Sequence, residues 1–208
     1  IISNDEEKAT WFKRVSNHDY NQWLSNSQNI PTEVKHNSNQ FYGLIHNSGC
    51  FDIALFLDKL KNDLKDLDSL LSIKIKSNDI IYRNDMWHIN SHKFRTVVIC
   101  NGWESMNDGF FSYLPFAPFK GQVIIVTTDN VPSSSFNDYI YNYGDYLLPL
   151  NNGMYKIGSS IEHNDLTYHI NPTFNIQLLN NANNMFNCKF NIVSSNVGIR
   201  PGIIDRYP

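Results

Sequence analysis

The spacing of hydrophobic residues predicts three helices. Apolar side chains recur at intervals of three and four along each of them, which gives a helix one apolar face. The pattern is most regular in the middle helix, whose apolar face we expect to be buried. Each helix begins near a residue whose side chain can cap an N-terminus. The predicted helices are residues 3–26, with Asn4 or Asp5 as the cap, residues 52–67, with Asp52 as the cap, and residues 173 to about 187, with Thr173 as the cap.

Alternating and continuous apolar runs predict strands elsewhere. Residues 71–76 alternate between polar and apolar positions, as in a strand with one buried face. Residues 96–100 form a continuous run, which is typical of a strand buried on both faces of a parallel sheet. Residues 27–40 are polar and contain Pro31, which indicates a loop. The other predicted strands are 41–45, a hairpin of 79–83 and 86–90 around Asn84-Asp85, 121–128, 145–150 and 154–160 joined by a turn at 151–153, and 190–193.

Composition and charge narrow the class of protein. The 208 residues are enough for one large domain or two small ones, and 41% hydrophobic residues are typical of a globular chain. A formal net charge of −3 lacks the basic excess of nucleic-acid-binding proteins, so no nucleic-acid partner is expected. No membrane span or signal peptide is recognisable. Cys50, Cys100 and Cys188 lie far apart, which predicts neither a disulfide nor a zinc site and favours the cytoplasm.

Two segments are candidates for contact with a ligand. The run 97–102 ends in Asn101-Gly102, and a glycine turn there either lets the backbone approach a ligand or is simply a tight connection. Arg200 stands between a glycine and a proline, where a guanidinium either anchors a carboxylate or lies on a surface turn. The seven histidines have no metal-ligand spacing, so no metal is expected. The motifs G-x-S-x-G, G-x-x-x-x-G-K-[ST] and G-x-G-x-x-G are absent from the sequence.

Five stretches follow one another in the order and spacing of a known enzyme family. Together they extend over about residues 41–208. They are Gly49-Cys-Phe-Asp52, Thr96–Gly102 with Trp103, Tyr113–Gln122 with its Lys-Gly-Gln, Tyr146-Leu-Leu-Pro149 through Glu162, and Gly198-Ile-Arg-Pro through Pro208. In these stretches the chain resembles the D-amino-acid oxidase/glycine oxidase-like (DAO) family of FAD-dependent oxidoreductases, and within it a bacterial branch.

The resemblance implies a fold and a reaction. The fold is α+β: a substrate-binding domain with a mostly antiparallel mixed sheet and flanking helices, interleaved with part of a Rossmann-like FAD-binding domain. By chain order, residues 1–40 and 112–196 would form the substrate-binding domain, and residues 41–111 and 197–208 the part of the FAD-binding domain. The reaction implied is the oxidation of an amine or amino-acid-like small molecule by hydride transfer to FAD.

The resemblance assigns two residues to the substrate. Arg200 matches the arginine that pairs with the substrate carboxylate in amino-acid-oxidising members. Tyr146 matches a tyrosine that hydrogen-bonds the substrate in some members. Lys120 and Gln122 match the architecture where the chain enters the substrate domain, and no residue is matched to a catalytic base.

On the flavin side, Gly102 with its neighbours Asn101 and Trp103 matches the turn that lies against the flavin dinucleotide. The family's opening strand, its G-x-G-x-x-G loop and the acidic residue that binds the ribose have no counterpart in the sequence. We therefore expect the chain to be an internal part of a longer parent protein that binds FAD. Alone, it should be inactive and should not retain the cofactor.

Two alternatives stay open at this stage. The first is a flavoprotein domain of a tRNA-modifying enzyme, which the near-neutral charge disfavours. The second is a non-enzymatic α+β module that binds a small ligand or a protein. The sequence names neither the substrate, nor the electron acceptor, nor the number of subunits.

Overall fold

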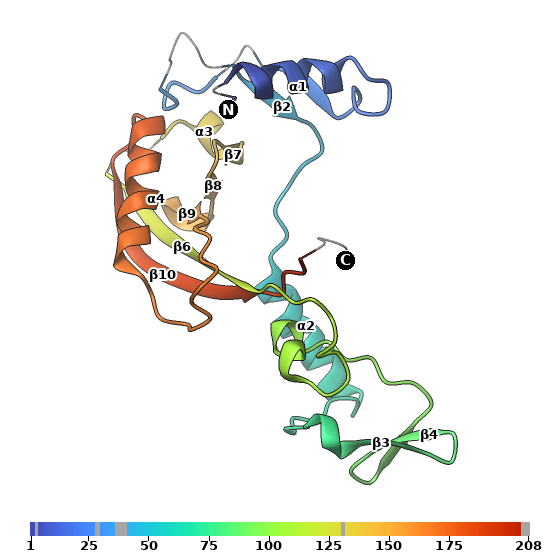
Figure 1. Ribbon diagram of the computed structural model, residues 1–208. Helices are drawn as coiled ribbons and strands as arrows, with labels where there is room; N and C mark the ends of the chain where they lie inside the picture. Colours follow the sequence, from blue (N-terminus) through green and yellow to red (C-terminus); the bar gives the residue numbers. More distant parts are fainter. Residues whose placement is uncertain (3, 28–29, 36–40, 130–131, 205–208) are drawn as a thin grey trace. The chain divides into compact units, whose positions relative to one another are not determined.

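The computed structural model describes residues 1–208 except 3, 28–29, 36–40, 130–131 and 205–208 (Figure 1). It confirms the α+β class predicted from the sequence, with antiparallel strand pairs and flanking helices. The chain forms two compact units, Ile1–Gly49 with Phe119–Ile199 and Cys50–Pro118 with Arg200–Pro208, and each is described by itself. No helix in the described ranges is long and apolar enough to cross a membrane.

The first unit is built around a five-stranded sheet in the order β10-β6-β9-β8-β7. The pairs β6–β9, β9–β8 and β8–β7 are antiparallel. The predicted turn between β8 and β9 is confirmed, with φ angles of 62° at Asn152 and 69° at Gly153. The strands are β6 (Phe119–Thr128), β7 (Tyr141–Asn142), β8 (Tyr146–Pro149), β9 (Met154–Gly158) and β10 (Phe190–Arg200), of which β10 runs well beyond the predicted strand.

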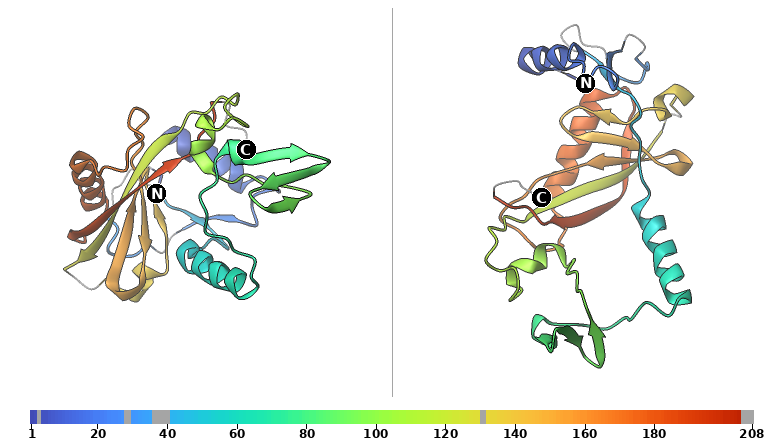
Figure 2. Two further views of the ribbon diagram at one scale, coloured as in Figure 1. Left: turned by 90° about the horizontal axis from the view of Figure 1, so that it is seen from below. Right: turned by 90° about the vertical axis from the view of Figure 1, so that its right-hand side faces the viewer.

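Helix α4 (Pro172–Met185) packs against one face of this sheet (Figures 1 and 2). Its cap is Asn171 rather than the predicted Thr173. Pro172 occupies the first helical position and has no N–H, so the Asn171 Oδ1 accepts from the N–H of Thr173 at 3.0 Å. The core between helix and sheet is formed by buried apolar residues from both, including Ile124, Val126, Leu147, Tyr155, Ile157, Leu178, Ala182 and Phe186.

The N-terminal part of the first unit contains less helix than predicted. Helix α1 (Asp5–Val15) begins at the predicted cap Asn4, whose side chain accepts from the N–H of Glu7. It ends at Val15 because the polar residues that follow form turns, and β1 (Leu24–Asn26) then pairs antiparallel with β2 (Gly43–Ile45). The first unit also contains the short helix α3 (Ser134–Asn137). Part of the predicted loop 27–40 lies outside the described residues.

The second unit contains α2 (Ile53–Asp66) and a three-stranded antiparallel sheet. Asp52 caps α2 as predicted, because its Oδ1 accepts from the N–H of Leu55 at 3.0 Å. The predicted hairpin is also confirmed, since Asn84 and Asp85 both have positive φ angles between its strands. The strands of this sheet are β3 (Ile80–Arg83), β4 (Met86–Ile89) and β5 (His92–Phe94).

Three predictions for the second unit are wrong. Neither 71–76 nor 96–100 is a strand, and Val98 in the second run is 79% exposed. A strand needs a neighbour to satisfy its backbone hydrogen bonds, and among the described residues no strand of this unit pairs with either segment. Helix α2 forms, but none of its residues is buried, so its apolar face is exposed.

Candidate functional site

The predicted site residues are divided between the two units. Tyr146 is the first residue of β8 and belongs to the first unit. Arg200 ends β10 and is the first residue of the C-terminal segment of the second unit. Asn101, Gly102 and Trp103 belong to the second unit as well. The structure therefore gives two separate local environments, one around Tyr146 and one containing the other residues.

Tyr146 lies on the face of the sheet that does not carry the core. It pairs across the strands with Gly158, whereas the next pair, Leu147 and Ile157, is buried in the core. A Cβ atom at Gly158 would lie only 3.1 Å from the Tyr146 Oη and 2.5 Å from the Val123 Cγ1. The tyrosine ring thus covers position 158, and only glycine leaves room for it.

Lys156 shares this face with Tyr146. It pairs with Ile125 on one side and with Leu148 on the other, and all three side chains are half-buried. We call this surface the second face; its residues are Val123, Ile125, Tyr146, Leu148, Lys156 and Gly158. Sequence reasoning missed Lys156, although its spacing of two from Gly158 placed both residues on one side of a predicted strand.

On the opposite, covered face, Lys120 is a structural cation. Its side chain is only 2% exposed, and its Nζ lies 3.1 Å from the Glu162 Oε2 and in closer contact with the Asp165 carboxylate. The hydrogen bond to Asp165 raises the pKa of Lys120, and the same bond lowers the pKa of Asp165. This ammonium is neutralised from within the chain, which fits an architectural role.

Gln122 joins β6 to the beginning of α4. The buried Gln122 Nε2 donates to the Asn171 carbonyl at 2.9 Å and to the Asn175 Oδ1 at 2.6 Å. The Gln122 Oε1 accepts from the N–H of Asn171 at 2.8 Å. Every polar atom of this amide is therefore directed to α4 and its cap, and none is left for a ligand.

The turn at Asn101–Trp103 opens a short 3-10 helix (Gly102–Asn107). Gly102 has a φ of 62°, which favours glycine, and a Cβ atom built there would meet nothing within 4 Å. Asn101 fixes the turn: its Nδ2 donates to the Asp108 Oδ2 at 3.2 Å, and its Oδ1 accepts from the Ser105 hydroxyl. The turn is thus held by its own side chains and leaves open space beside the glycine.

Arg200 lies in a segment that is hydrogen-bonded to residues 115–117. The N–H of Ala117 donates to the Gly202 carbonyl at 2.7 Å, and the N–H of Ile204 donates to the Pro115 carbonyl at 3.0 Å. Two of the motifs that carried the family resemblance, far apart in the sequence, are therefore adjacent in the second unit. The Arg200 side chain is exposed at the start of this paired segment.

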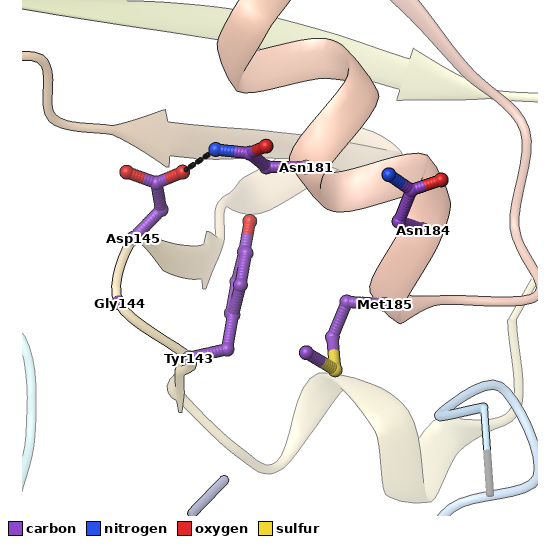
Figure 3. Close-up of a pocket in the computed structure, with 6 residues that line it drawn as sticks. All are labelled: Tyr143, Gly144, Asp145, Asn181, Asn184 and Met185. Carbon is purple, nitrogen blue, oxygen red and sulfur yellow. Dashed lines mark hydrogen bonds between the residues drawn. The ribbon is translucent and has the colours of Figure 1, made fainter. Parts of the chain in front are cut away.

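A hollow of about 370 Å³ lies between the β7–β8 turn and the end of α4 (Figure 3). The Asn181 Nδ2 donates there to the Asp145 Oδ2 at 2.8 Å. Burial raises the pKa of Tyr143, whose hydroxyl has no hydrogen-bond partner among the described residues. The hollow contains none of the predicted site residues; it is lined by Tyr143, Gly144, Asp145, Asn181, Asn184 and Met185.

The cysteines and acidic residues provide no further centre in the described part of the chain. All three cysteines are free, with Cys50 and Cys100 exposed and Cys188 buried. Burial raises the pKa of the Cys188 thiol to about 11, so it stays protonated at neutral pH. No group of three or more His, Cys, Asp or Glu residues within the described ranges could hold a metal ion.

Comparison with known proteins identifies a family, and the similar solved structures include two glycine oxidases. The family model described as "FAD dependent oxidoreductase" (DAO) matches residues 2–208. The glycine oxidase from Geobacillus kaustophilus is 20% identical with a TM-score of 0.50, over 62% of this chain and 37% of that chain. The glycine oxidase from Bacillus cereus ATCC 14579 is 20% identical with a TM-score of 0.48, over 62% of this chain and 38% of that chain. The chain thus spans well under half the length of either glycine oxidase. At 20% identity, the likeness to the Geobacillus kaustophilus enzyme is a likeness in fold alone.

Proposed function

Because the chain belongs to the DAO family of FAD dependent oxidoreductases, we propose that the full-length protein oxidises an amine or amino-acid-like substrate by hydride transfer to the flavin. The observation that carries this proposal is the family match, which extends from residue 2 to residue 208. The substrate class is supported by the residue-by-residue matches of Arg200 and Tyr146, and by the likeness in fold to the glycine oxidase from Geobacillus kaustophilus.

The turn at Asn101–Trp103 fits a contact with FAD. Gly102 has open space where a side chain would otherwise stand, and the hydrogen bonds of Asn101 fix the backbone before any ligand binds. Asn101, Gly102 and Trp103 would lie against the bound FAD, which would supply the hydride acceptor for the oxidation. The chain supplies this contact surface but has no G-x-G-x-x-G loop in its sequence for the pyrophosphate.

In this proposal Arg200 and Tyr146 hold the substrate. The Arg200 guanidinium forms two parallel hydrogen bonds to the substrate carboxylate, and the backbone bonds of its segment to residues 115–117 fix the position of the arginine. The Tyr146 hydroxyl adds a hydrogen bond that fixes the rotation of the substrate. Such positioning accelerates the reaction because the reacting C–H bond is already oriented.

The first test is the visible absorption spectrum of the purified full-length protein, followed by a screen of glycine, both enantiomers of other amino acids, and simple amines. We expect the two visible bands of a flavin and bleaching by an amino acid. A colourless protein that cannot be reconstituted with FAD would overturn the proposal and favour a binding module. Turnover only with RNA would overturn the substrate class.

The role of Arg200 is tested with Arg200→Ala and Arg200→Lys. Loss of a bidentate charged contact should lower kcat/KM for amino acids by about 30- to 1000-fold in the alanine variant. The kcat/KM of the lysine variant should lie between those of the wild type and the alanine variant, because lysine keeps the charge but not the fork geometry. Amines without a carboxylate are the control, and equal losses on both substrate classes would argue against a carboxylate contact.

A further inference from the structure

The second face carries a charged residue that the proposed function does not use. Lys156 lies on β9, which is the middle strand of the five-stranded sheet. Its neighbours across the strands are the aliphatic side chains of Ile125 and Leu148. A lysine at this position is half-buried among apolar groups instead of extending freely from a sheet edge.

The two lysines on opposite faces of the sheet differ in their partners. Lys120, on the covered face, contacts the carboxylates of both Glu162 and Asp165. For Lys156, no ion pair or hydrogen bond is found within the part of the chain that the structure describes. The stem of Lys156 packs beside apolar side chains, and its ammonium has no anion among the described residues. This ammonium is therefore available to an anion from outside the chain.

The carboxylates nearest in sequence to these strands are already engaged. Asp145, beside Tyr146, accepts a hydrogen bond from Asn181 on α4. Asp129, which follows β6, accepts one from the Asn191 side chain on β10. Glu162 and Asp165 contact Lys120, so each of these four acids has a partner other than Lys156.

Lys156 lies within reach of the tyrosine that the proposed function places at the substrate. Tyr146 pairs with Gly158 and Lys156 pairs with Leu148, so the two residues are diagonal neighbours on one face. Such positions are about 7–8 Å apart. A molecule with a short carbon chain between two polar ends would contact the tyrosine hydroxyl and the ammonium together.

We propose that Lys156 is a specificity-determining residue that binds a second anionic group on the substrate, so that the preferred substrates are amino acids with an acidic side chain. This inference rests on the proposed function, because that function is what places Tyr146 beside the substrate. The half-buried aliphatic groups of Ile125 and Leu148 strengthen the charged contact by excluding water around it.

The test compares glutamate with its uncharged analogue glutamine in the full-length flavoprotein, with both enantiomers of each. The wild-type protein should prefer glutamate. Lys156→Met should lower kcat/KM for glutamate by about 10- to 100-fold and change that for glutamine by less than about threefold. Lys156→Arg should retain most of the wild-type kcat/KM for glutamate, because arginine keeps the positive charge. Lys13→Met, at an exposed position of α1, is the matched control.

A binding measurement separates this inference from the proposed function. Calorimetric titration with glutarate and butyrate requires no turnover, and Lys156→Met should weaken the binding of glutarate alone. If no amino acid is oxidised but glutarate binding depends on Lys156, the proposed function fails and the anion contact stands. The inference fails, while the oxidase function remains, if Lys156→Met lowers kcat/KM for glutamate and glutamine equally. It also fails if the variant changes neither kcat/KM for glutamate nor the affinity for glutarate.

Discussion

Position 158 has no space for a side chain. A Cβ atom there would approach Val123 to 2.5 Å and the Tyr146 hydroxyl to 3.1 Å. We expect Gly158→Ala to destabilise the protein by about 1–3 kcal/mol, because it overfills a packed site, and to displace the tyrosine ring. Chemical denaturation and kcat/KM would measure the two effects. Adding Val123→Ala removes the nearest atom, so the double variant should recover part of the stability; no recovery would place the strain elsewhere.

The ion pair of Lys120 and Asp165 gives stability a pH dependence. The hydrogen bond from Lys120 holds the pKa of Asp165 well below its usual range. Such a carboxyl stabilises the fold at pH values above its unfolded pKa of about 3.9, and the contribution is lost as the pH falls through the lower, folded pKa. The difference in Tm between the wild type and Asp165→Asn should therefore be complete at neutral pH and shrink below about pH 4.

The control for this measurement is Asp58→Asn, which removes an exposed carboxylate from α2. Its Tm should stay close to that of the wild type at every pH. A difference between the wild type and Asp165→Asn that is constant with pH would show that packing of the side chain matters more than its charge.

At the scale of elements, the N-cap of α4 is a different residue in the structure from the one predicted from the sequence. The sequence favoured Thr173, whereas the structure has the Asn171 side chain bonded to the Thr173 N–H. Asn171→Ala should lower the free energy of unfolding by about 1 kcal/mol, the usual contribution of a cap. Thr173→Ala should change the free energy of unfolding by at most a few tenths of a kcal/mol, because the Thr173 side chain is exposed. Urea unfolding of both variants measures the difference; equal losses would contradict the assignment of the cap.

Local chemistry explains which elements could be predicted. Asp52 caps α2, and Asn84-Asp85 forms the hairpin turn, because each feature depends on a few adjacent residues. Residues 96–100 were expected to form a buried strand, but a strand depends on partners that its own sequence does not contain. The same limit applies to the candidate site: Lys156 became visible only when its pairing with Ile125 and Leu148 was known.

At the scale of the whole molecule, the chain should not hold its cofactor alone. The proposed function assigns a contact with FAD to the turn at Asn101–Trp103, but the sequence contains no G-x-G-x-x-G loop to bind the pyrophosphate. The purified 208-residue chain should therefore be colourless after incubation with FAD and desalting, whereas the full-length protein should be yellow. Stoichiometric flavin on the 208-residue chain would show that a pyrophosphate loop is not required.

The backbone contact between residues 115–117 and the segment of Gly202 and Ile204 also sets an order of events on the ribosome. Cys50–Pro118 is synthesised after Ile1–Gly49, then Phe119–Ile199 of the first unit follows, and only then the segment that begins at Arg200. While β6 to β10 are translated, the Ala117 N–H and the Pro115 carbonyl of the second unit lack their hydrogen-bond partners at Gly202 and Ile204. Incompletely paired intermediates of this kind are prone to misfolding. A chain whose translation stops within β10 lacks Arg200, so the carboxylate contact proposed for this arginine requires that all of Phe119–Ile199 be synthesised before it.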